Sequence, residues 1–363
     1  MATPHVRGPI LATLLALGIG ASPCAASPET SAGPFATGAL GPDSSLPDRA
    51  VDARELPHVV LHADDGDQAP LPYYRLAPDT YFFYGNIAQV NTRNRGFNGN
   101  AGFVVADAGV VVIDALGTPK LGRRMIATIR SVTDRPITHL ILTHNHPDHS
   151  YGAVAFRRLG GVRIIAHQGT LAYLNSSQID ASVHYRRSLI PGDMKGFEPV
   201  RPDTLVDGPL YARMTLEVGN RRFDIYNVGA HHSYGDLVIH QRPDDILWIA
   251  DLAFNQRVTY MGDGDSALAL RGEQWLLEQF PDVRLMVPGH GSAQTRPFPM
   301  VARTHAYIRR LRQTMARAIE QGIGLRRAVN QADFPDWKDV PLYDLNHRAN
   351  ANFVYREMER ELF

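Results

Sequence analysis

The chain has 363 residues, and its 37 Lys and Arg residues are balanced by 37 Asp and Glu residues, so its formal net charge at pH 7 is zero. This balance argues against a nucleic-acid or anionic-membrane partner, which would need a field of positive charge, and it favours a small-molecule substrate. Cys24 is the only cysteine. The chain therefore cannot form an internal disulfide, and removal of Cys24 with an export signal would leave no thiol to bind a metal.

The first 26 residues predict a cleaved export signal. A mildly positive start precedes an apolar run at 10–19, and small residues follow up to Ala26. The apolar run is too short to cross a bilayer, so we expect a periplasmic or secreted protein without a membrane span. Lipid attachment at Cys24 is the alternative, although Pro23 stands where a small residue is usual.

The rest of the chain divides into three parts. Residues 27–72 are rich in Pro, Gly, Ser, Ala and Asp and show no apolar periodicity, which predicts a flexible leader. We expect the domain itself to span residues 73–300 and a C-terminal helical extension, residues 301–363, to pack on it.

The first predicted strands surround a polar stretch. Runs of β-branched and aromatic residues predict three strands, over 80–85, 102–106 and 110–114. Residues 86–100, rich in Asn, Gly and Arg, form either a mobile flap over the site or an ordinary surface loop. Asp114 ends the third strand, ahead of a helix predicted over 120–131.

The stretch around the next strand carries the chemistry. An apolar, β-branched run over 137–143 predicts a buried strand, and Pro147 stops its regular continuation. The loop packs three imidazoles and a carboxylate into six residues, namely His144, His146, Asp148 and His149. Zn²⁺ and similar cations prefer these ligands, and a His-x-His pair can converge on one ion while the other two side chains point to a second. A polar loop whose histidines only satisfy backbone groups is the alternative.

The remaining patterns complete a fold. A helix is predicted over 153–159, a strand over 162–166, and mixed helix and loop over 168–195. Four more strands are predicted over 214–218, 222–228, 236–240 and 246–251. Two groups of strands flanked by helices predict an α/β fold, a four-layer αβ/βα sandwich with two mixed β-sheets. His167, at a strand end, is either an extra ligand or, as we favour, a structural residue.

The loop motif resembles that of the metallo-β-lactamase-fold hydrolases, which have the pattern His-x-His-x-Asp-His. Four further motifs of that family occur in the family's order. They are Asp114 at the end of a strand, His232 in a His-Ser-x-Gly-Asp turn, Asp251 at the end of a hydrophobic strand, and His290 in a Pro-Gly-His-Gly turn. The resemblance covers roughly residues 100–291 and implies the same fold.

The resemblance also implies a centre of two zinc ions. One ion would be held by His144, His146 and His232. The second would be held by Asp148, His149 and His290, with Asp251 as the bridge. A hydroxide shared by the two ions would be the nucleophile, and Asp148, the predicted catalytic residue, would also orient it.

Two residues are expected behind these ligands. Asp114 would orient a ligand imidazole or brace the loop backbone, with a simple helix cap as the alternative. His231 competes with His232 for one ligand position. His232 is favoured because the family's ligand stands three residues before the Gly of this turn, Gly235, so His231 becomes a neighbour of the centre.

The implied function is an exported zinc-dependent hydrolase of a small ester, lactone, β-lactam amide or thioester. His146 replaces the Glu of the flavin-linked di-iron reductases of this fold, and Asp251 replaces the Cys of one lactamase subclass. An iron-dependent oxidoreductase similar to the persulfide dioxygenases stays open, as does a metal-binding accessory protein of a periplasmic redox system. Export and a balanced charge oppose an RNA-processing relative.

Substrate-binding residues are not assigned by the sequence. Polar candidates for a substrate wall are Tyr173, His184, Tyr185, Arg186 and Arg187. Residues 258–265, after the predicted bridging Asp, form either a rim of the site or a surface loop.

The C-terminal extension begins with an amphipathic helix, predicted over 300–321, and ends with a helix that reaches Phe363. It resembles the tail of exported metallo-β-lactamase-fold hydrolases associated with periplasmic quinoprotein or sulfur-oxidation systems, some of them called quinoprotein relay metallohydrolases. This resemblance implies periplasmic redox partners. His347, in the tail, is expected to be structural.

Overall fold

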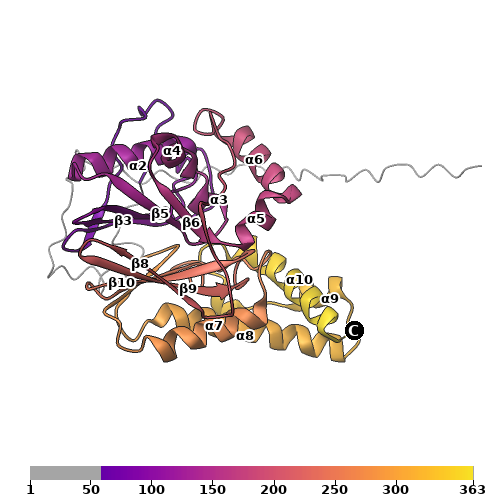
Figure 1. Cartoon of the computed structure of the whole chain (residues 1–363). Helices are drawn as coiled ribbons and strands as arrows, with labels where there is room; N and C mark the ends of the chain where they lie inside the picture. Colours follow the sequence, from indigo (N-terminus) through magenta and orange to yellow (C-terminus); the bar gives the residue numbers. More distant parts are fainter. Residues whose placement is uncertain (1–58, 363) are drawn as a thin grey trace, which may run out of the picture. The chain divides into compact units, whose positions relative to one another are not determined.

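The computed structural model describes residues 59–362. The expected export signal, residues 1–26, and the larger part of the expected leader lie outside these residues, so export stays a prediction. The described chain forms two β-sheets, with helices on the outer face of each (Figure 1). Within residues 59–362, no helix combines the length and the apolar character needed to cross a bilayer.

The first half of the chain forms a seven-stranded sheet whose spatial order follows the sequence. Its strands are β1 (Tyr74–Ala77), β2 (Thr80–Phe83), β3 (Ala101–Ala106), β4 (Gly109–Ile113), β5 (Ile137–Leu142), β6 (Arg163–His167) and β7 (Thr204–Val206). The pairs from β1 to β4 are antiparallel and those from β4 to β7 are parallel. Parallel neighbours need crossover connections, and helices supply them here.

These crossover helices are α2 (Pro119–Val132), α4 (Ala153–Leu159), α5 (Gly169–Leu174) and α6 (Ser177–Leu189). α2 begins where the Thr118 side chain accepts a hydrogen bond from the backbone N–H of Leu121 at 3.1 Å, and Pro119 occupies the first helical turn. Met125 of α2 and Phe156 of α4 share one buried cluster with the outer side chains of the sheet. α2 and α4 therefore form the first layer (Figure 1).

The described end of the expected leader, residues 59–72, packs on this layer. Leu61 and Leu71 are buried in the same cluster as Met125. The backbone N–H of Leu71 donates to Thr128 Oγ1 at 2.8 Å, and Arg124 on α2 forms an ion pair with Asp65 at 2.9 Å. This part of the segment is thus attached to α2, because two leucines find an apolar surface that composition alone did not reveal.

The second half forms a five-stranded sheet in the order β12, β11, β10, β9, β8. The strands are β8 (Arg213–Val218), β9 (Arg221–Gly229), β10 (Asp236–Arg242), β11 (Ile246–Ala250) and β12 (Leu285–Pro288). β11 and β12 pair in parallel and the other pairs are antiparallel, so this sheet is also mixed. α7 (Ser266–Gln279) forms the crossover from β11 to β12.

The two sheets bury one cluster between them and two clusters on their outer faces. Phe82 and Ile141 of the first sheet share the inner cluster with Phe223 and Trp248 of the second. The outer face of the second sheet packs against α7 and the start of α8, with Leu276 in that cluster. The order helix, sheet, sheet, helix is the four-layer sandwich predicted from the sequence, and this prediction is confirmed.

Helices after His290 pack beside α7. They are α8 (Pro299–Glu320), α9 (Leu325–Gln331), the short 3-10 helix η1 (Pro335–Trp337) and α10 (Tyr343–Leu362). α10 contacts both α8 and α9, and the three share a buried cluster that includes Tyr307 and Val354. The same cluster contains Val258 and Met261 from the loop after β11, so the C-terminal helices reach the part of the chain that leads to the site.

Candidate metal centre

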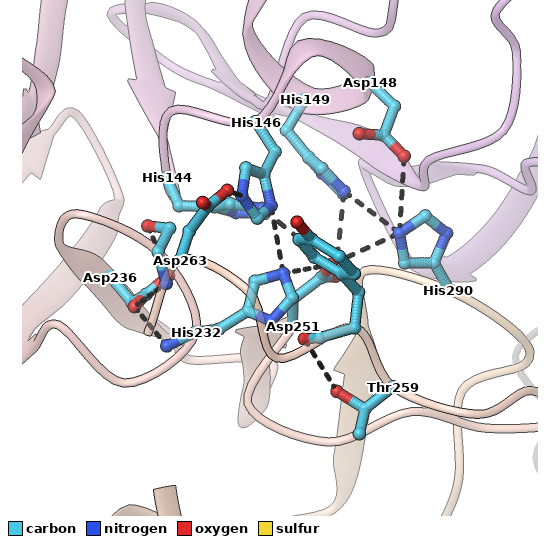
Figure 2. Close-up of polar contacts among 12 residues, drawn as sticks. His144, His146, Asp148, His149, His232, Asp236, Asp251, Thr259, Asp263 and His290 are labelled. Atoms are coloured by element: carbon cyan, nitrogen blue, oxygen red, sulfur yellow. Dashed lines mark hydrogen bonds and ion pairs between the residues drawn. The ribbon is translucent and has the colours of Figure 1, made fainter. Parts of the chain in front are cut away.

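Four segments bring polar side chains to the same end of the two sheets. The loop after β5 runs into the short helix α3 (Pro147–Ser150) and carries the four side chains of the His-x-His-x-Asp-His motif. His232 lies in the turn between β9 and β10, Asp251 directly follows β11, and His290 follows β12. Figure 2 shows these side chains converging, and all seven residues singled out as ligands from the sequence lie together.

The seven side chains form two groups. His144, His146, His232 and Asp251 make up the first, and Asp148, His149 and His290 make up the second. Asp251 lies between them, since its Oδ2 is 3.1 Å from His232 Nε2 and 3.3 Å from His290 Nε2. One carboxylate can therefore serve both groups, as expected for a bridging ligand.

The donor set fits divalent cations. His144 is fully buried, and its Nε2 has no hydrogen-bond partner within the described chain, while its Nδ1 lies 3.0 Å from Thr143 Oγ1. Nitrogen atoms of different rings also face each other, with His232 Nε2 3.0 Å from His146 Nδ1. Buried polar atoms without partners are rare, so unshared electron pairs that point to a common position indicate a cation site.

Electrostatics favour positive charge at the same position. Burial lowers the pKa of His149, but the carboxylates of Asp251 and Asp114 outweigh this effect and raise the pKa to about 9. Burial raises the pKa of Asp148, but His149, His290 and Arg186 hold it well below its usual range. Without metal ions, the cluster thus binds protons, which neutralise its carboxylates in place of cations.

Glycines allow the close packing around the ligands. A Cβ atom on Gly289 would lie 2.0 Å from Asp251 Oδ1, and one on Gly99 would lie 2.7 Å from the Asp148 carbonyl oxygen. In the turn of His232, Asp236 Oδ2 accepts hydrogen bonds from the backbone N–H groups of His232 and Ser233, at 2.8 and 3.0 Å. Gly99, Gly289 and Asp236 therefore position the ligand residues and are not ligands themselves.

Asp114 lies behind His149, at the end of β4. Its Oδ2 is 2.9 Å from His149 Nδ1, and its Oδ1 accepts a hydrogen bond from the backbone N–H of Thr143 at 2.8 Å. The carboxylate thus holds the proton of His149 on Nδ1 and leaves Nε2 available to a cation. Burial raises the pKa of Asp114, and hydrogen bonds from His149 and Thr143 reduce that shift without cancelling it. Asp114 both orients an imidazole and braces the loop.

The 86–100 stretch is a wall of the site, held by buried asparagines. Asn98 Nδ2 donates to Asp148 Oδ2 at 2.8 Å, and the Asn98 carbonyl oxygen accepts from His290 Nδ1 at 2.7 Å. Asn100 Nδ2 donates to the carbonyl oxygens of Pro288 and Gly291, both at 2.8 Å. Of the two alternatives, a mobile flap or an ordinary surface loop, these buried contacts exclude the surface loop and attach the end of the stretch to the ligand residues. No sequence motif identified Asn98.

Asp263 is a second residue that the sequence did not single out. Its Oδ2 is 3.0 Å from His146 Nε2 (Figure 2). Its Oδ1 accepts a hydrogen bond from Gln178 Nε2 of α6 at 3.0 Å. His146 therefore presents Nδ1 to the first group and Nε2 to Asp263, the same division that Asp114 imposes on His149. Asp263 lies in residues 258–265, which form a rim of the cavity rather than a separate surface loop.

His231, His167 and His347, which the sequence placed near the centre or in structural roles, lie outside the two groups. His231 is buried against α7, where a Cβ atom on Gly272 would lie 2.5 Å from its ring, and burial lowers its pKa to about 4. It is next to His232 in sequence but belongs to neither ligand group. His167 Nε2 lies 2.9 Å from Asn227 Oδ1, and His347 Nε2 donates to the Ala332 carbonyl oxygen at 2.9 Å, so both are structural.

A cavity of about 380 Å³ opens onto the two groups. Tyr173 and Arg186 of the proposed substrate wall line it, together with Tyr260 and Arg257 from the loop after β11. The other three candidates do not line it, and Tyr185 is exposed to solvent. His184, Tyr185 and Arg187 were thus wrong as wall residues, because they project from α6 away from the cavity.

A family model described as the metallo-β-lactamase superfamily matches residues 94–290, more than half of the chain. The chain belongs to the metallo-β-lactamase superfamily. Among superfamily members, a type 2 metallo-β-lactamase of Bacillus sp. (strain 170) is 24% identical over 213 residues, 56% of this chain and 72% of that protein. A linear primary-alkylsulfatase of Pseudomonas sp. (strain ATCC 19151) is 33% identical over 73 residues, 19% of this chain and 14% of that protein.

Solved structures share the metallo-β-lactamase fold. The sec-alkylsulfatase Pisa1 from Pseudomonas sp. aligns with a TM-score of 0.63 at 18% identity, over 79% of this chain and 50% of that one, so this chain spans about half the length of that enzyme. A metallo-β-lactamase from Pontibacter korlensis aligns with a TM-score of 0.51 at 17% identity, over 66% of this chain and 99% of that one. The chain is thus a member of this superfamily with a candidate site for divalent metal ions.

Proposed function

We propose that the protein is an exported hydrolase that acts on a small ester, lactone, β-lactam or thioester with two zinc ions. The observation that carries the proposal is the pair of ligand groups joined by Asp251, with the His144 Nε2 lone pair unused. When bound, the two cations supply an acidified water and positive charge at the reacting oxygen. Export, suggested by residues 1–26, belongs to the proposal.

The ligand assignment follows the two groups. His144, His146 and His232 would hold one ion, and Asp148, His149 and His290 the other, with Asp251 shared. Asp114 and Asp263 keep protons on the outer nitrogens of His149 and His146, so that the inner nitrogens stay free to bind.

Asp148 is the proposed catalytic residue. It lines the cavity, and its Oδ2 accepts from Asn98 at 2.8 Å and lies 3.4 Å from His290 Nε2. Because its pKa is held well below the usual range, it stays ionised and accepts a hydrogen bond from a water rather than donating one. It can therefore orient the attacking water through that hydrogen bond.

The substrates to be tested are chosen from the proposed classes and from the activities named for the relatives. Penicillin-type lactams, aliphatic lactones, aryl esters and thioesters cover the proposed classes. An alkyl sulfate ester joins them, because the alkylsulfatase likeness extends over 79% of this chain. Partners of a periplasmic redox system, which the tail suggests, belong to the proposal as well.

Metal analysis and one variant test the proposal. We expect about two zinc ions per chain in the purified protein and hydrolysis of at least one panel member. Asp148→Ala should lower kcat by about 10²- to 10⁴-fold, whereas Asp180→Ala, at an exposed position of α6, should not. One iron per chain with no hydrolysis by either protein would favour the oxidoreductase alternative and overturn the proposal.

A further inference from the structure

Two of the buried arginines lack the partners that buried arginines normally have. Arg124, Arg186, Arg221 and Arg257 are all at most 9% exposed. Arg124 forms an ion pair with Asp65 at 2.9 Å and Arg221 with Asp244 at 2.8 Å. Within residues 59–362, Arg186 and Arg257 have no carboxylate within ion-pair distance, and these two are the ones that line the cavity. Asp148 and Asp251 attract these arginines only at longer range, and a buried charge without a direct ion-pair contact is destabilising, so a reason for keeping both is required.

Their hydrogen bonds leave most donors unused. Arg186 Nη1 donates to the Gly117 carbonyl oxygen at 3.1 Å. Arg257 Nη1 donates only a long bond, 3.4 Å, to the carbonyl oxygen of Ile87, and its buried Nε has no partner within the described chain. A guanidinium carries five N–H donors, so each side chain could still bind an acceptor from outside the protein.

The contact between Arg257 and His290 does not satisfy either group. Arg257 Nη1 lies 3.0 Å from His290 Nδ1, which is itself 2.7 Å from the Asn98 carbonyl oxygen. The carbonyl can only accept, so Nδ1 carries a proton and donates it to Asn98. Arg257 therefore faces another donor, and this contact is not a hydrogen bond.

Aromatic rings hold the two guanidinium groups in place. Arg186 lies over the ring of Tyr151 with its Cζ 5.7 Å from the centroid, and Arg257 lies over Phe254 at 5.5 Å. The two side chains come from distant segments, α6 and the loop after β11, and both reach the cavity. A pre-ordered guanidinium loses little conformational freedom when it binds an oxyanion.

The formal charge of the cavity also indicates that the two arginines are available to bind an anionic ligand. Its ionised side chains are three carboxylates, Asp148, Asp251 and Asp263, and the two guanidinium groups, which give a formal charge of minus one. Two divalent cations would make this plus three, and two of the three carboxylates would then be metal ligands. The arginines are not needed to neutralise the protein's own groups in that state, so they are available to a ligand.

We propose that Arg186 and Arg257 form a subsite for an oxyanion of the substrate, so that the protein selects esters or amides that carry a carboxylate, sulfate or phosphate group. This rests on the proposed hydrolase function. The guanidinium fork matches the paired oxygens of such groups, and charge-assisted hydrogen bonds in a buried site are strong. Tyr173 and Tyr260 line the same cavity and border the rest of the substrate.

Anion binding tests the subsite without catalysis. Isothermal titration of the zinc-loaded protein with sulfate, phosphate and succinate identifies which oxyanion is preferred. Arg186→Met and Arg257→Met should each weaken binding of the preferred anion about tenfold or more at unchanged zinc content. Arg187→Met, one residue along α6 and outside the cavity, is the matched control and should bind like wild type. Unchanged anion affinity in both cavity variants would overturn the proposal.

Thermal stability separates a ligand-binding role from a structural one. Removing a paired buried arginine, as in Arg221→Met, should lower Tm, because Asp244 loses its partner. Removing an unpaired one should leave Tm of the zinc-loaded, anion-free protein unchanged or higher. A loss of Tm in Arg186→Met and Arg257→Met as large as that in Arg221→Met would contradict the proposal. In that case the arginines serve the fold.

Activity distinguishes failure of the subsite from failure of the hydrolase. If hydrolysis is observed, the wild type should prefer a monoanionic ester over its neutral methylated analogue, and both cavity variants should lose this preference. Hydrolysis with equal rates on charged and neutral esters would refute the subsite alone. Arginine-dependent anion binding without hydrolysis of any ester would refute the hydrolase function and leave the anion site standing.

Discussion

Two loops line the same cavity and are held in different ways. The loop of residues 143–149 is short and follows β5, and its main support is Asp114 at the end of the neighbouring strand β4. The loop of residues 252–265 is longer and is held from the C-terminal helix α10. Asn350 Nδ2 donates to the Thr259 carbonyl oxygen at 2.8 Å, and Asn350 Oδ1 accepts from the backbone N–H of Met261 at 3.0 Å.

This difference separates two tasks of the site. The 143–149 loop carries four of the seven ligand candidates and depends on the sheet, which is the core of the fold. The 252–265 loop carries Arg257, Tyr260 and Asp263 to the cavity and depends on helices that follow the last ligand, His290. Metal binding should therefore be sensitive to changes in the sheet, and substrate selection to changes in α10.

The largest effect is expected at Asp114. Asp114→Asn should lower activity and zinc affinity about 10- to 100-fold. The amide offers one acceptor where Thr143 N–H and His149 Nδ1 both need one, so it either leaves the Thr143 N–H without a partner or turns an N–H toward His149 and favours the wrong tautomer. Zinc content after dialysis and kcat measure the effect. Asp134→Asn, at an exposed position, is the control, and equal zinc retention in both variants would contradict this role.

Asp263 is the counterpart of Asp114 on the second loop, with a smaller expected effect. Asp263→Asn should lower kcat/KM about tenfold or less, because Asp263 contacts solvent and a water can replace the lost acceptor. Its other partner, Gln178, is exposed and can turn away. The ratio of kcat/KM between the Asp114→Asn and Asp263→Asn variants measures how unequally the loops contribute. A larger loss of kcat/KM in Asp263→Asn than in Asp114→Asn would contradict the proposed difference between the two loops.

The contrast between the loops also explains what the sequence could predict. The four ligand candidates of the 143–149 loop follow a predicted strand, and the other three were found because their turn and strand-end motifs resemble those of the metallo-β-lactamase family. The same periodicity predicted nine of the strands and the helices α2, α4, α8 and α10, but it missed the short strands β1, β7 and β12 and the crossover helix α7. His144 follows a strand that the sequence predicts, whereas His290 was found only from its Pro-Gly-His-Gly turn, although it also lies at the end of a strand, β12.

Asn98, Asp263 and Arg257 could not be found in this way. They lie in segments without periodicity, and their positions depend on partners far along the chain. Asn98 meets His290, and the loop of Asp263 is anchored by Asn350. Asparagine is as common in surface turns as in buried contacts of this kind, so composition could not distinguish the two. Tertiary contacts decided these positions.

Loosening α10 tests whether the second loop can be perturbed alone. Asn350→Ala removes the two bonds to the loop and a third to Tyr307 Oη at 3.2 Å. It should lower the free energy of unfolding by about 1 to 3 kcal/mol and raise KM several-fold, with zinc content unchanged. Urea unfolding and steady-state kinetics measure both effects. Asn352→Ala, two residues along the helix, is the control. Loss of zinc in Asn350→Ala would show that the loops are not independent.

The smallest effect on activity is expected at Glu273, which lies in α7 and does not line the cavity. Its side chain is 0% exposed and has no hydrogen-bond partner within the described chain, although His305 Nδ1 of α8 is 3.2 Å from its Oε2. Burial raises the pKa of Glu273 well above its usual value, and burial also lowers the pKa of His305. Both shifts favour the uncharged form of the group, so the two side chains do not stabilise each other as an ion pair.

Glu273→Gln should therefore change stability with pH and leave the site intact. A carboxyl whose pKa is raised on folding contributes stability that is complete below about pH 4.5 and is lost as pH rises through the folded-state pKa. Glutamine does not titrate, so the unfolding free energy of the variant relative to wild type should increase from pH 5 to pH 8.

Urea unfolding of both zinc-loaded proteins at the two pH values measures this difference. Protonation of the ligand histidines is the same in both proteins and cancels in the difference. A pH-independent difference would contradict a raised pKa of Glu273 in the folded protein. In either case kcat and zinc content should stay within about twofold of wild type, since neither loop contacts this carboxyl.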